Sequence, residues 1–129
     1  YEDNFFDIIF CSHVIEHVKD PIDFIKKTAK ITKVHGELII STPNFDCAMA
    51  RRYGEKFRMY NDPTHITFFS DLTLREALED YGFYVERTEY PYFDTKYFNQ
   101  ESLGKLFDSS AKTSPPFYGN IMTLYCKKK

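Results

Sequence analysis

The first apolar segment of the chain is a short, nearly continuous run over residues 5–11. Polar residues flank it on both sides, with Asp3-Asn4 before it and Ser12-His13 after it. A run of this length without polar alternation is typical of a strand that is covered on both faces, as in a parallel sheet. We therefore expect a buried strand here.

A helix and a second strand follow at short spacing. Asp20-Pro21 is a helix start, because the Asp side chain accepts bonds from free backbone amides and proline suits the first helical position. Apolar residues then recur at helical spacing, and Gly36 is the expected end of the helix. The next apolar run covers residues 38–42 and is closed by Pro43. This order predicts two parallel strands joined by a right-handed crossover.

The rest of the chain continues the alternation of helices and strands. The expected elements are a short helix over 46–53, an irregular connection over 54–67, a helix from Ser70 or Asp71 to Gly82, a strand over 83–90, a helix over 99–107 and a final strand over 121–126. No repeat or polar linker divides these segments. The sequence therefore predicts one α/β unit over residues 1–129.

The polar residues directly after the first strand are the main candidates for chemistry. Ligands of open α/β sheets bind beyond the carboxyl ends of the strands, which is where His13, Glu16 and His17 fall. If residues 13–17 form a helical turn, the spacing puts these three side chains on one face. They would then bind a divalent metal or supply a general base. A structural role is the alternative, with Glu16 bonded to backbone amides and His17 packed at the core edge.

Several segments in order resemble the class I S-adenosylmethionine-dependent methyltransferases from their fourth strand onward. They are Phe6-Asp7-Ile8-Ile9, Val14-Ile15-Glu16-His17-Val18 with Asp20-Pro21, Gly36-Glu37-Leu38-Ile39-Ile40-Ser41-Thr42-Pro43-Asn44, and His65-Ile66-Thr67-Phe68-Phe69-Ser70 with Gly82-Phe83. The resemblance implies a Rossmann-like sheet of seven strands with the last one antiparallel, of which this chain would hold strands four to seven. It also implies methyl transfer from S-adenosylmethionine to an oxygen or nitrogen of a small-molecule acceptor.

A narrower resemblance implies roles for single residues. Some ubiquinone-biosynthesis O-methyltransferases and the small-RNA 3′-terminal 2′-O-methyltransferases carry Glu-x-x-Glu-His here as ligands of a divalent metal, and the RNA enzymes add a downstream histidine. The matching residues are His13, Glu16, His17 and His65, with histidine in place of the first Glu. We hypothesise that His13, His17 or His65 takes the proton of the acceptor or holds the metal that acidifies it.

Contacts with the cofactor and the substrate follow from the same likeness. Ser12 and His13 would touch the methionine end of the cofactor, and Asn44 would either anchor the substrate or form a turn. The glycine-rich cofactor loop and the ribose-binding acid of the family have no counterpart, since no two glycines are close together. We therefore expect a partial domain, most of whose cofactor site precedes Tyr1, and which by itself is inactive.

That expectation extends to the first strand. The family places this strand in the middle of its sheet, so without its neighbour the strand would present an unpaired apolar edge. Such an edge invites pairing with another chain. We expect the free chain to self-associate through it.

Three other classes of protein fit parts of the pattern. His13-x-x-Glu16-His17 also spells an inverted zinc-metallopeptidase motif, but that motif needs a long helix, and Asp20-Pro21 begins a new helix just after it. A nucleotide-binding oxidoreductase half would share the strand-helix-strand unit. A non-catalytic association module with this fold is the third alternative.

Composition narrows the compartment and the partners. The net charge of −2 offers no electrostatic footprint for nucleic acid, and the terminal lysines fit a solvated tail. Three cysteines without paired spacing indicate free thiols of a reducing compartment, so a cytoplasmic location is expected. No run reaches the roughly 18 apolar residues of a membrane span, so we expect no membrane partner.

Overall fold

A computed structural model describes all residues 1–129. Four strands form one sheet in the order β1-β2-β4-β3. They are β1 (Phe6–Ser12), β2 (Thr32–Pro43), β3 (Phe83–Glu89) and β4 (Ile121–Lys128). β1 and β2 are parallel, and β4 runs antiparallel to β2 and to β3. The predicted α/β fold with an antiparallel last strand is confirmed.

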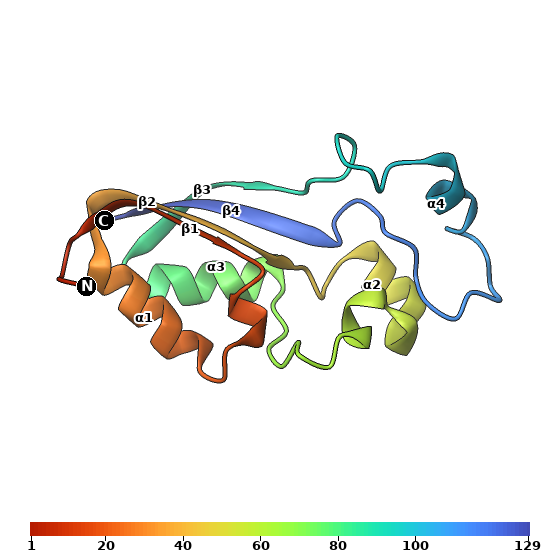
Figure 1. The fold of residues 1–129 in the computed structure, drawn as a ribbon, viewed down its shortest axis with the longest axis horizontal. Coiled ribbons are helices and arrows are strands. Elements are labelled where there is room, and N and C mark those ends of the chain that lie inside the picture. Colours follow the sequence, from red (N-terminus) through yellow and green to blue (C-terminus); the bar gives the residue numbers. More distant parts are fainter.

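The helices are distributed unevenly around this sheet. α1 (Pro21–Ile31) and α3 (Asp71–Asp80) lie against the same face, and the opposite face carries no helix (Figure 1). The remaining elements are α2 (Ala48–Tyr53), α4 (Gln100–Gly104) and the 3-10 turns η1 (Ile15–His17), η2 (Gly54–Lys56) and η3 (Arg58–Asn61). None of the helices has the length and apolar character needed to cross a lipid bilayer.

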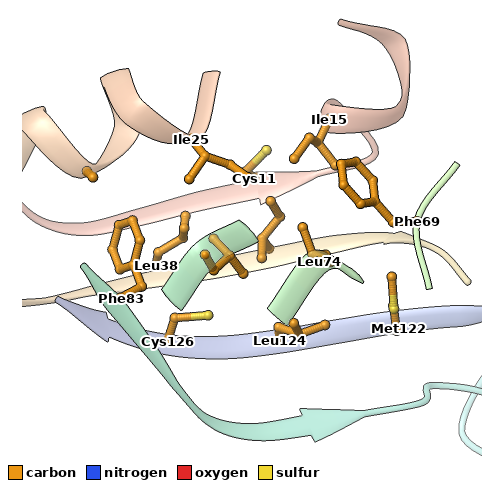
Figure 2. Packing of buried hydrophobic residues seen from close by; sticks show 13 residues of the cluster. Cys11, Ile15, Ile25, Leu38, Phe69, Leu74, Phe83, Met122, Leu124 and Cys126 are labelled. Atoms are coloured by element: carbon orange, nitrogen blue, oxygen red, sulfur yellow. The ribbon is translucent and has the colours of Figure 1, made fainter. Parts of the chain in front are cut away.

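The core fills the space between the sheet and its two covering helices (Figure 2). Alternate residues of β4 point into it, so that Met122, Leu124 and Cys126 are buried while their neighbours are partly exposed. Ile25 from α1 and Leu74 from α3 face them and are shielded from solvent. Each such aliphatic side chain stabilises the fold by about 1.5–3 kcal/mol relative to an exposed position.

Both long helices begin where the sequence predicts. The Asp20 carboxylate accepts a hydrogen bond from the backbone amide of Asp23 at 2.8 Å. Ser70 and Thr73 bond reciprocally, with the Thr73 amide donating to Ser70 Oγ at 3.1 Å and the Ser70 amide donating to Thr73 Oγ1 at 2.9 Å. These contacts satisfy amides that have no partner within a helix. Gly82 follows α3 with φ of 89°, as expected of a residue that ends a helix.

The predicted helix end at Gly36 is wrong. α1 stops at Ile31, and Thr32 already pairs with Phe6 as the first residue of β2. The next aligned pair is Ile8 with Glu37, so the residues between bulge out of the strand. Within this bulge a Cβ on Gly36 would lie only 2.8 Å from the carbonyl oxygen of Lys33. Gly36 is therefore needed for close backbone approach rather than for a helix cap.

Two further expectations are corrected. β1 is covered on one face only, since Ile8 is 59% and Phe10 is 69% exposed, whereas Cys11 is buried. This follows from the lack of a helix on the open face and from the position of β1 at the sheet edge. The helix expected over 99–107 is shorter, because α4 ends at Gly104 and turns follow it.

Candidate functional site

The candidate site lies at the carboxyl end of β1. Because β1 and β2 are parallel, their carboxyl ends meet, and the amide of His13 donates to the carbonyl of Ser41 at 2.9 Å. His13 has φ of 53°, in the left-handed region that a non-glycine residue adopts at a cost. Backbone strain of this kind concentrates at functional sites. Ser12, directly before it, is exposed at the strand end.

Glu16 is the central residue of the site, and it is completely shielded from solvent. Its Oε1 atom bonds to Nδ1 of His13 at 3.0 Å, and its Oε2 atom accepts from Thr42 Oγ1 at 2.9 Å. Burial alone would raise the pKa of Glu16, but the bonds from His13, its own backbone amide and Thr42 outweigh burial and lower that pKa. Glu16 is therefore a carboxylate at neutral pH.

The bond to Glu16 fixes the tautomer of His13. A carboxylate only accepts hydrogen bonds, so Nδ1 of His13 must carry the hydrogen between them. In the neutral ring, Nε2 then keeps a free lone pair. The His13 side chain is 48% exposed and lines a cavity of about 250 Å³. A buried carboxylate that orients a histidine toward a cavity is an arrangement suited to general-base catalysis.

His17 and His65 form a second group around the same carboxylate. Nδ1 of His17 bonds to the carbonyl oxygen of Thr64 at 3.0 Å, and Nδ1 of His65 bonds to that of Met59 at 2.7 Å. Both Nδ1 atoms must donate, which leaves both Nε2 atoms as acceptors. One ligand atom from each histidine and one oxygen of Glu16 all lie within 4.8 Å of one another. Such a group of acceptor atoms is suited to a cation.

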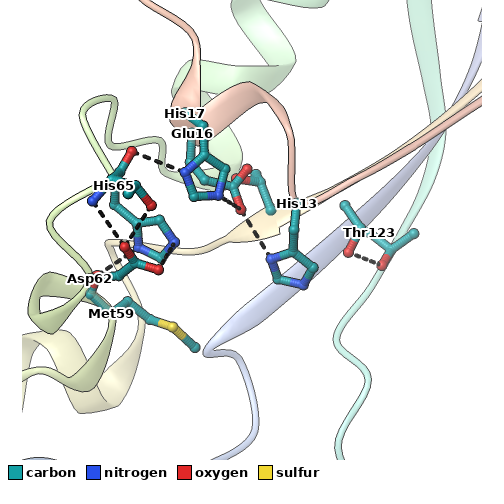
Figure 3. Close-up of polar contacts among 10 residues, drawn as sticks. His13, Glu16, His17, Met59, Asp62, His65 and Thr123 are labelled. Atoms are coloured by element: carbon teal, nitrogen blue, oxygen red, sulfur yellow. Dashed lines mark hydrogen bonds and ion pairs between the residues drawn. The ribbon is translucent and has the colours of Figure 1, made fainter.

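The structure brings together three of the four residues that the sequence suggested as metal ligands. Glu16, His17 and His65 gather, whereas His13 lies on the other side of the Glu16 carboxylate (Figure 3). The helical turn expected over 13–17 is reduced to the three residues of η1, so His13 does not share a helix face with His17. The long helix required by a metallopeptidase motif is absent for the same reason.

Asn44 and Thr42 show the limits of the sequence interpretation at the next strand. Asn44 is buried, and its Oδ1 atom accepts from the amide of Asp46 at 3.1 Å, which makes a local turn. It is not part of the cavity wall beside His13. No sequence pattern predicts a role for Thr42, although its hydroxyl donates to Glu16. Its place at the end of the neighbouring parallel strand is the signal that could have indicated it.

Comparison with known proteins identifies the family of this chain. A sequence model described as a methyltransferase domain matches residues 1–88. The chain belongs to the class I S-adenosylmethionine-dependent methyltransferase family. Among solved structures, it resembles a SAM-dependent methyltransferase from Thermotoga maritima at a TM-score of 0.66 and 21% identity, covering 99% of this chain and 58% of that one. A SAM-dependent methyltransferase from Archaeoglobus fulgidus gives 0.65 and 20%, with 98% and 61% covered.

Three other results limit what the family implies. This methyltransferase-family chain spans about 60% of the length of the solved structures just described. The [4+2]-cyclase SpnF shares the fold at a TM-score of 0.64 and 20% identity, over 99% of this chain and 52% of the cyclase. No curated protein is significantly similar to the sequence. The fold therefore does not by itself fix the reaction, and the site has to carry the functional argument.

Proposed function

We propose that this chain is the acceptor-side part of an S-adenosylmethionine-dependent methyltransferase that modifies an oxygen or nitrogen of a small molecule. The observation that carries the proposal is the bond between His13 and Glu16. It leaves Nε2 of His13 free, and His13 lines the cavity. Family membership supplies the class of reaction.

The proposed role of His13 is that of general base. Thr42 and the buried surroundings fix the Glu16 carboxylate, and the carboxylate fixes the ring of His13. An acceptor hydroxyl that becomes methylated must lose its proton, and Nε2 of His13 takes it up. The positive charge that then develops on the ring is stabilised by Glu16, as in other carboxylate–histidine pairs. General bases of this kind accelerate reactions by about 10²–10⁴-fold.

The residues present fit one side of a cofactor site. S-adenosylmethionine, when bound, supplies a methyl group on a positively charged sulfur. Ser12 and His13 stand exposed at the carboxyl end of an edge strand, where the family holds its cofactor. The glycines stand far apart in the chain, so no glycine-rich loop that could cradle the rest of the molecule is present. We therefore assign to this chain only the contacts at the reactive end.

This assignment predicts weak cofactor binding by residues 1–129 alone. Titration calorimetry of the 129-residue chain with S-adenosylmethionine should give no dissociation constant below about 10 µM, which corresponds to about −7 kcal/mol. Tighter binding would mean that the chain holds the main cofactor contacts itself, and this division of the site would be wrong.

The role of His13 is tested in the intact protein that carries this chain. We expect His13→Asn to lower kcat by about 10²–10⁴-fold and to change the affinity for S-adenosylmethionine far less, because Asn keeps a polar side chain at the reactive end of the cofactor. Asn tolerates the left-handed backbone of this position, so the fold should persist. The assay is transfer of labelled methyl groups to a panel of small hydroxylated and aminated acceptors.

A matched control exists within the chain. His35 also has a positive φ, of 65°, but it is exposed in the bulge of β2. His35→Asn should leave kcat unchanged. Full activity of His13→Asn would remove His13 as the base, and a complete lack of methyl transfer by the unaltered protein would favour the non-catalytic association module.

We further propose a divalent metal bound by Glu16, His17 and His65. Both imidazoles are held by backbone carbonyls, Nε2 of His17 lies 3.9 Å from Oε1 of Glu16, and Nε2 of His65 lies 3.7 Å from Oδ2 of Asp62. Because Oε1 of Glu16 has two lone pairs, it can accept the hydrogen bond from His13 with one and bind a cation with the other. A metal here would lower the pKa of a bound acceptor hydroxyl.

Cobalt(II) is a suitable probe, because its absorption spectrum reports imidazole ligation independently of activity. The chain should show the bands of a bound cobalt ion, and His17→Ala should lose them. His35→Ala, which removes an exposed histidine, should keep them. If the unaltered chain gives no cobalt spectrum, or if chelator leaves the intact enzyme fully active, the metal proposal fails.

A further inference from the structure

The cavity beside His13 has a volume of about 250 Å³ and is lined by residues from several segments of this chain. Arg58 of η3 contributes to it, together with Tyr92 and Tyr97 from the segment after β3 and Phe117 from the segment before β4. These parts of the sequence are far apart and belong to the irregular connections. The fold gathers them next to the proposed base.

The size and the aromatic character of the wall indicate a small planar ligand. A closed apolar cavity of about 150 Å³ is large enough to hold benzene. The present volume of about 250 Å³ therefore suits one substituted ring. Tyr92, Tyr97 and Phe117 offer ring faces and edges, which stabilise a second aromatic ring beyond the burial of its area.

Arg58 gives the cavity one positive charge. It is half-buried and forms no ion pair with any carboxylate of the chain, and it is the only residue of the wall with a permanent charge. The guanidinium of Arg58 lies 5.7 Å from the ring centre of Tyr97, and the backbone amide of Arg58 donates to Ser114 Oγ at 3.0 Å. A single guanidinium matches a singly charged carboxylate, which it can bind through two parallel bonds.

Tyr92 adds a hydroxyl group without a partner. Its side chain is buried, with 3% of the residue exposed, and its hydroxyl is the one buried side-chain polar atom of the chain that lacks a hydrogen bond. Leaving such a group unsatisfied costs about 1–3 kcal/mol. Buried polar groups of native proteins nearly always have a partner. Tyr92 lines this cavity and also a second one after β3, and its hydroxyl is sealed from solvent in the free chain. A ligand in the cavity beside His13 would therefore supply the missing partner only after a small shift of the Tyr92 ring.

We propose that this cavity binds a one-ring aromatic carboxylic acid that carries a hydroxyl group, and that this compound is the methyl acceptor. The carboxylate pairs with Arg58, the ring packs among the aromatic side chains, and Tyr92 bonds to an oxygen of the ligand. The hydroxyl faces His13, an identification that rests on the function proposed above. Binding is measured without methyl transfer, so its test does not depend on that function.

Binding is tested on the 129-residue chain without cofactor. The probe is 4-hydroxybenzoate, measured by titration calorimetry against 4-hydroxybenzamide, which has the same ring and no charge. The acid should bind at least tenfold more tightly than the amide. Arg58→Gln should abolish this preference, while Arg52→Gln should retain it, since Arg52 is exposed and lies outside this cavity.

Tyr92→Phe separates a role in binding from a role in the fold. Removing an unsatisfied hydroxyl should leave the stability of the free chain unchanged or raise it. The same change should weaken 4-hydroxybenzoate binding by about threefold or more if the hydroxyl contacts the ligand. A variant that loses stability and keeps its affinity would show that the hydroxyl serves the fold, which would contradict the proposal.

The remaining outcomes distinguish the cavity from the reaction. Equal affinity for the acid and the amide, or no binding of either, overturns the aromatic-acid proposal, while methylation of other acceptors by the intact protein would keep the proposed function. Binding of the acid that requires Arg58 supports the cavity assignment even if no methyl transfer is found. In that case it is the proposed function that fails.

Discussion

At the scale of single residues, Glu16 connects most of the candidate site. One carboxylate holds His13 and Thr42 through its side chain, and its backbone carbonyl accepts from the amides of Ile66 and Thr67 at 2.9 and 3.1 Å. The residue thereby joins the end of β1, the end of β2 and the connection before α3. A charged group this deeply buried is tolerated because each of its oxygens is hydrogen-bonded.

We expect Glu16→Gln to destabilise the chain by about 1.5–3 kcal/mol, the range for hydrogen bonds to a charged group. The amide has the same size but only one accepting atom, so either His13 or Thr42 faces a donor. Urea unfolding monitored by circular dichroism measures the change. Glu86→Gln, at an exposed position that makes no side-chain hydrogen bond or ion pair, should stay within about 0.5 kcal/mol of the unaltered chain. Equal effects of the two changes would contradict this role of Glu16.

The buried thiols have a consequence for stability at high pH. Burial raises the pKa of Cys126 to about 12 and that of Cys11 to about 11. Thiols of the unfolded chain ionise near pH 8.5, so above this pH the unfolded state releases protons that the folded state retains. The free energy of unfolding should therefore fall as pH rises from about 8.5 toward 11.

The contribution of one thiol is at most about 1.4 kcal/mol per pH unit in that window. Urea midpoints at pH 7.5 and 10 measure it, with Cys126→Ala as the comparison, because lysines and tyrosines titrate in both proteins. The loss of stability between the two pH values should be smaller in the variant. An identical loss of stability in both proteins would mean that Cys126 ionises as readily in the folded chain as in the unfolded chain.

At the scale of elements, the β2 bulge decides how the first strand pair is aligned. β2 begins three residues before His35, and the bulge brings Gly36 against the backbone of its own strand and of β1. A Cβ at this position would lie 2.8 Å from the carbonyl oxygen of Lys33 and 3.1 Å from that of Asp7. Backbone atoms cannot move aside as the end of a flexible side chain can.

Gly36→Ala should therefore destabilise the chain by about 1–3 kcal/mol, the usual cost of forcing an additional carbon into a packed site. Gly104→Ala is the matched control, since a Cβ there meets nothing within 4 Å and the residue ends α4. That change should be neutral or stabilising by about 0.5–1 kcal/mol. Chemical denaturation of both variants compares them, and a neutral Gly36→Ala would show that the bulge relaxes.

At the scale of the whole molecule, the sheet is covered on one side and open on the other (Figure 1). β1 is an edge strand, and the open face exposes 59% of Ile8 and 69% of Phe10. Leaving a few hundred Å² of apolar surface in water costs several kcal/mol at about 25 cal/mol per Å². An apolar strand edge with unpaired backbone groups is also a template for another strand.

We propose that the free chain self-associates through this edge at micromolar concentration. The chain concentration needed for association should rise at least tenfold in Phe10→Lys, because charged side chains discourage edge pairing. Sedimentation and light scattering measure this concentration. Phe107→Lys removes an aromatic ring that is 79% exposed but lies beyond α4, and it should leave association unchanged. A monomer that persists without either change would show that the edge does not pair.

The sequence by itself determined those features that depend on local chemistry and periodicity. The apolar runs of the strands, the caps at Asp20 and Ser70 and the turn at Gly82 are encoded within a few residues, and all of them are confirmed. The family resemblance added the antiparallel last strand. Spacing also suggested the candidate residues after β1, because ligand sites follow the carboxyl ends of parallel strands.

Only the tertiary structure decided which of those residues meet. Thr42 reaches Glu16 because parallel strands end side by side, and His65 joins His17 because Glu16 holds the connection between them. His13 separates from both because the backbone leaves β1 through a left-handed residue rather than a helix. The cavity wall brings Arg58 to Tyr92 and Phe117 across long loops. Contacts of this range have no period in the sequence, so packing alone selects them.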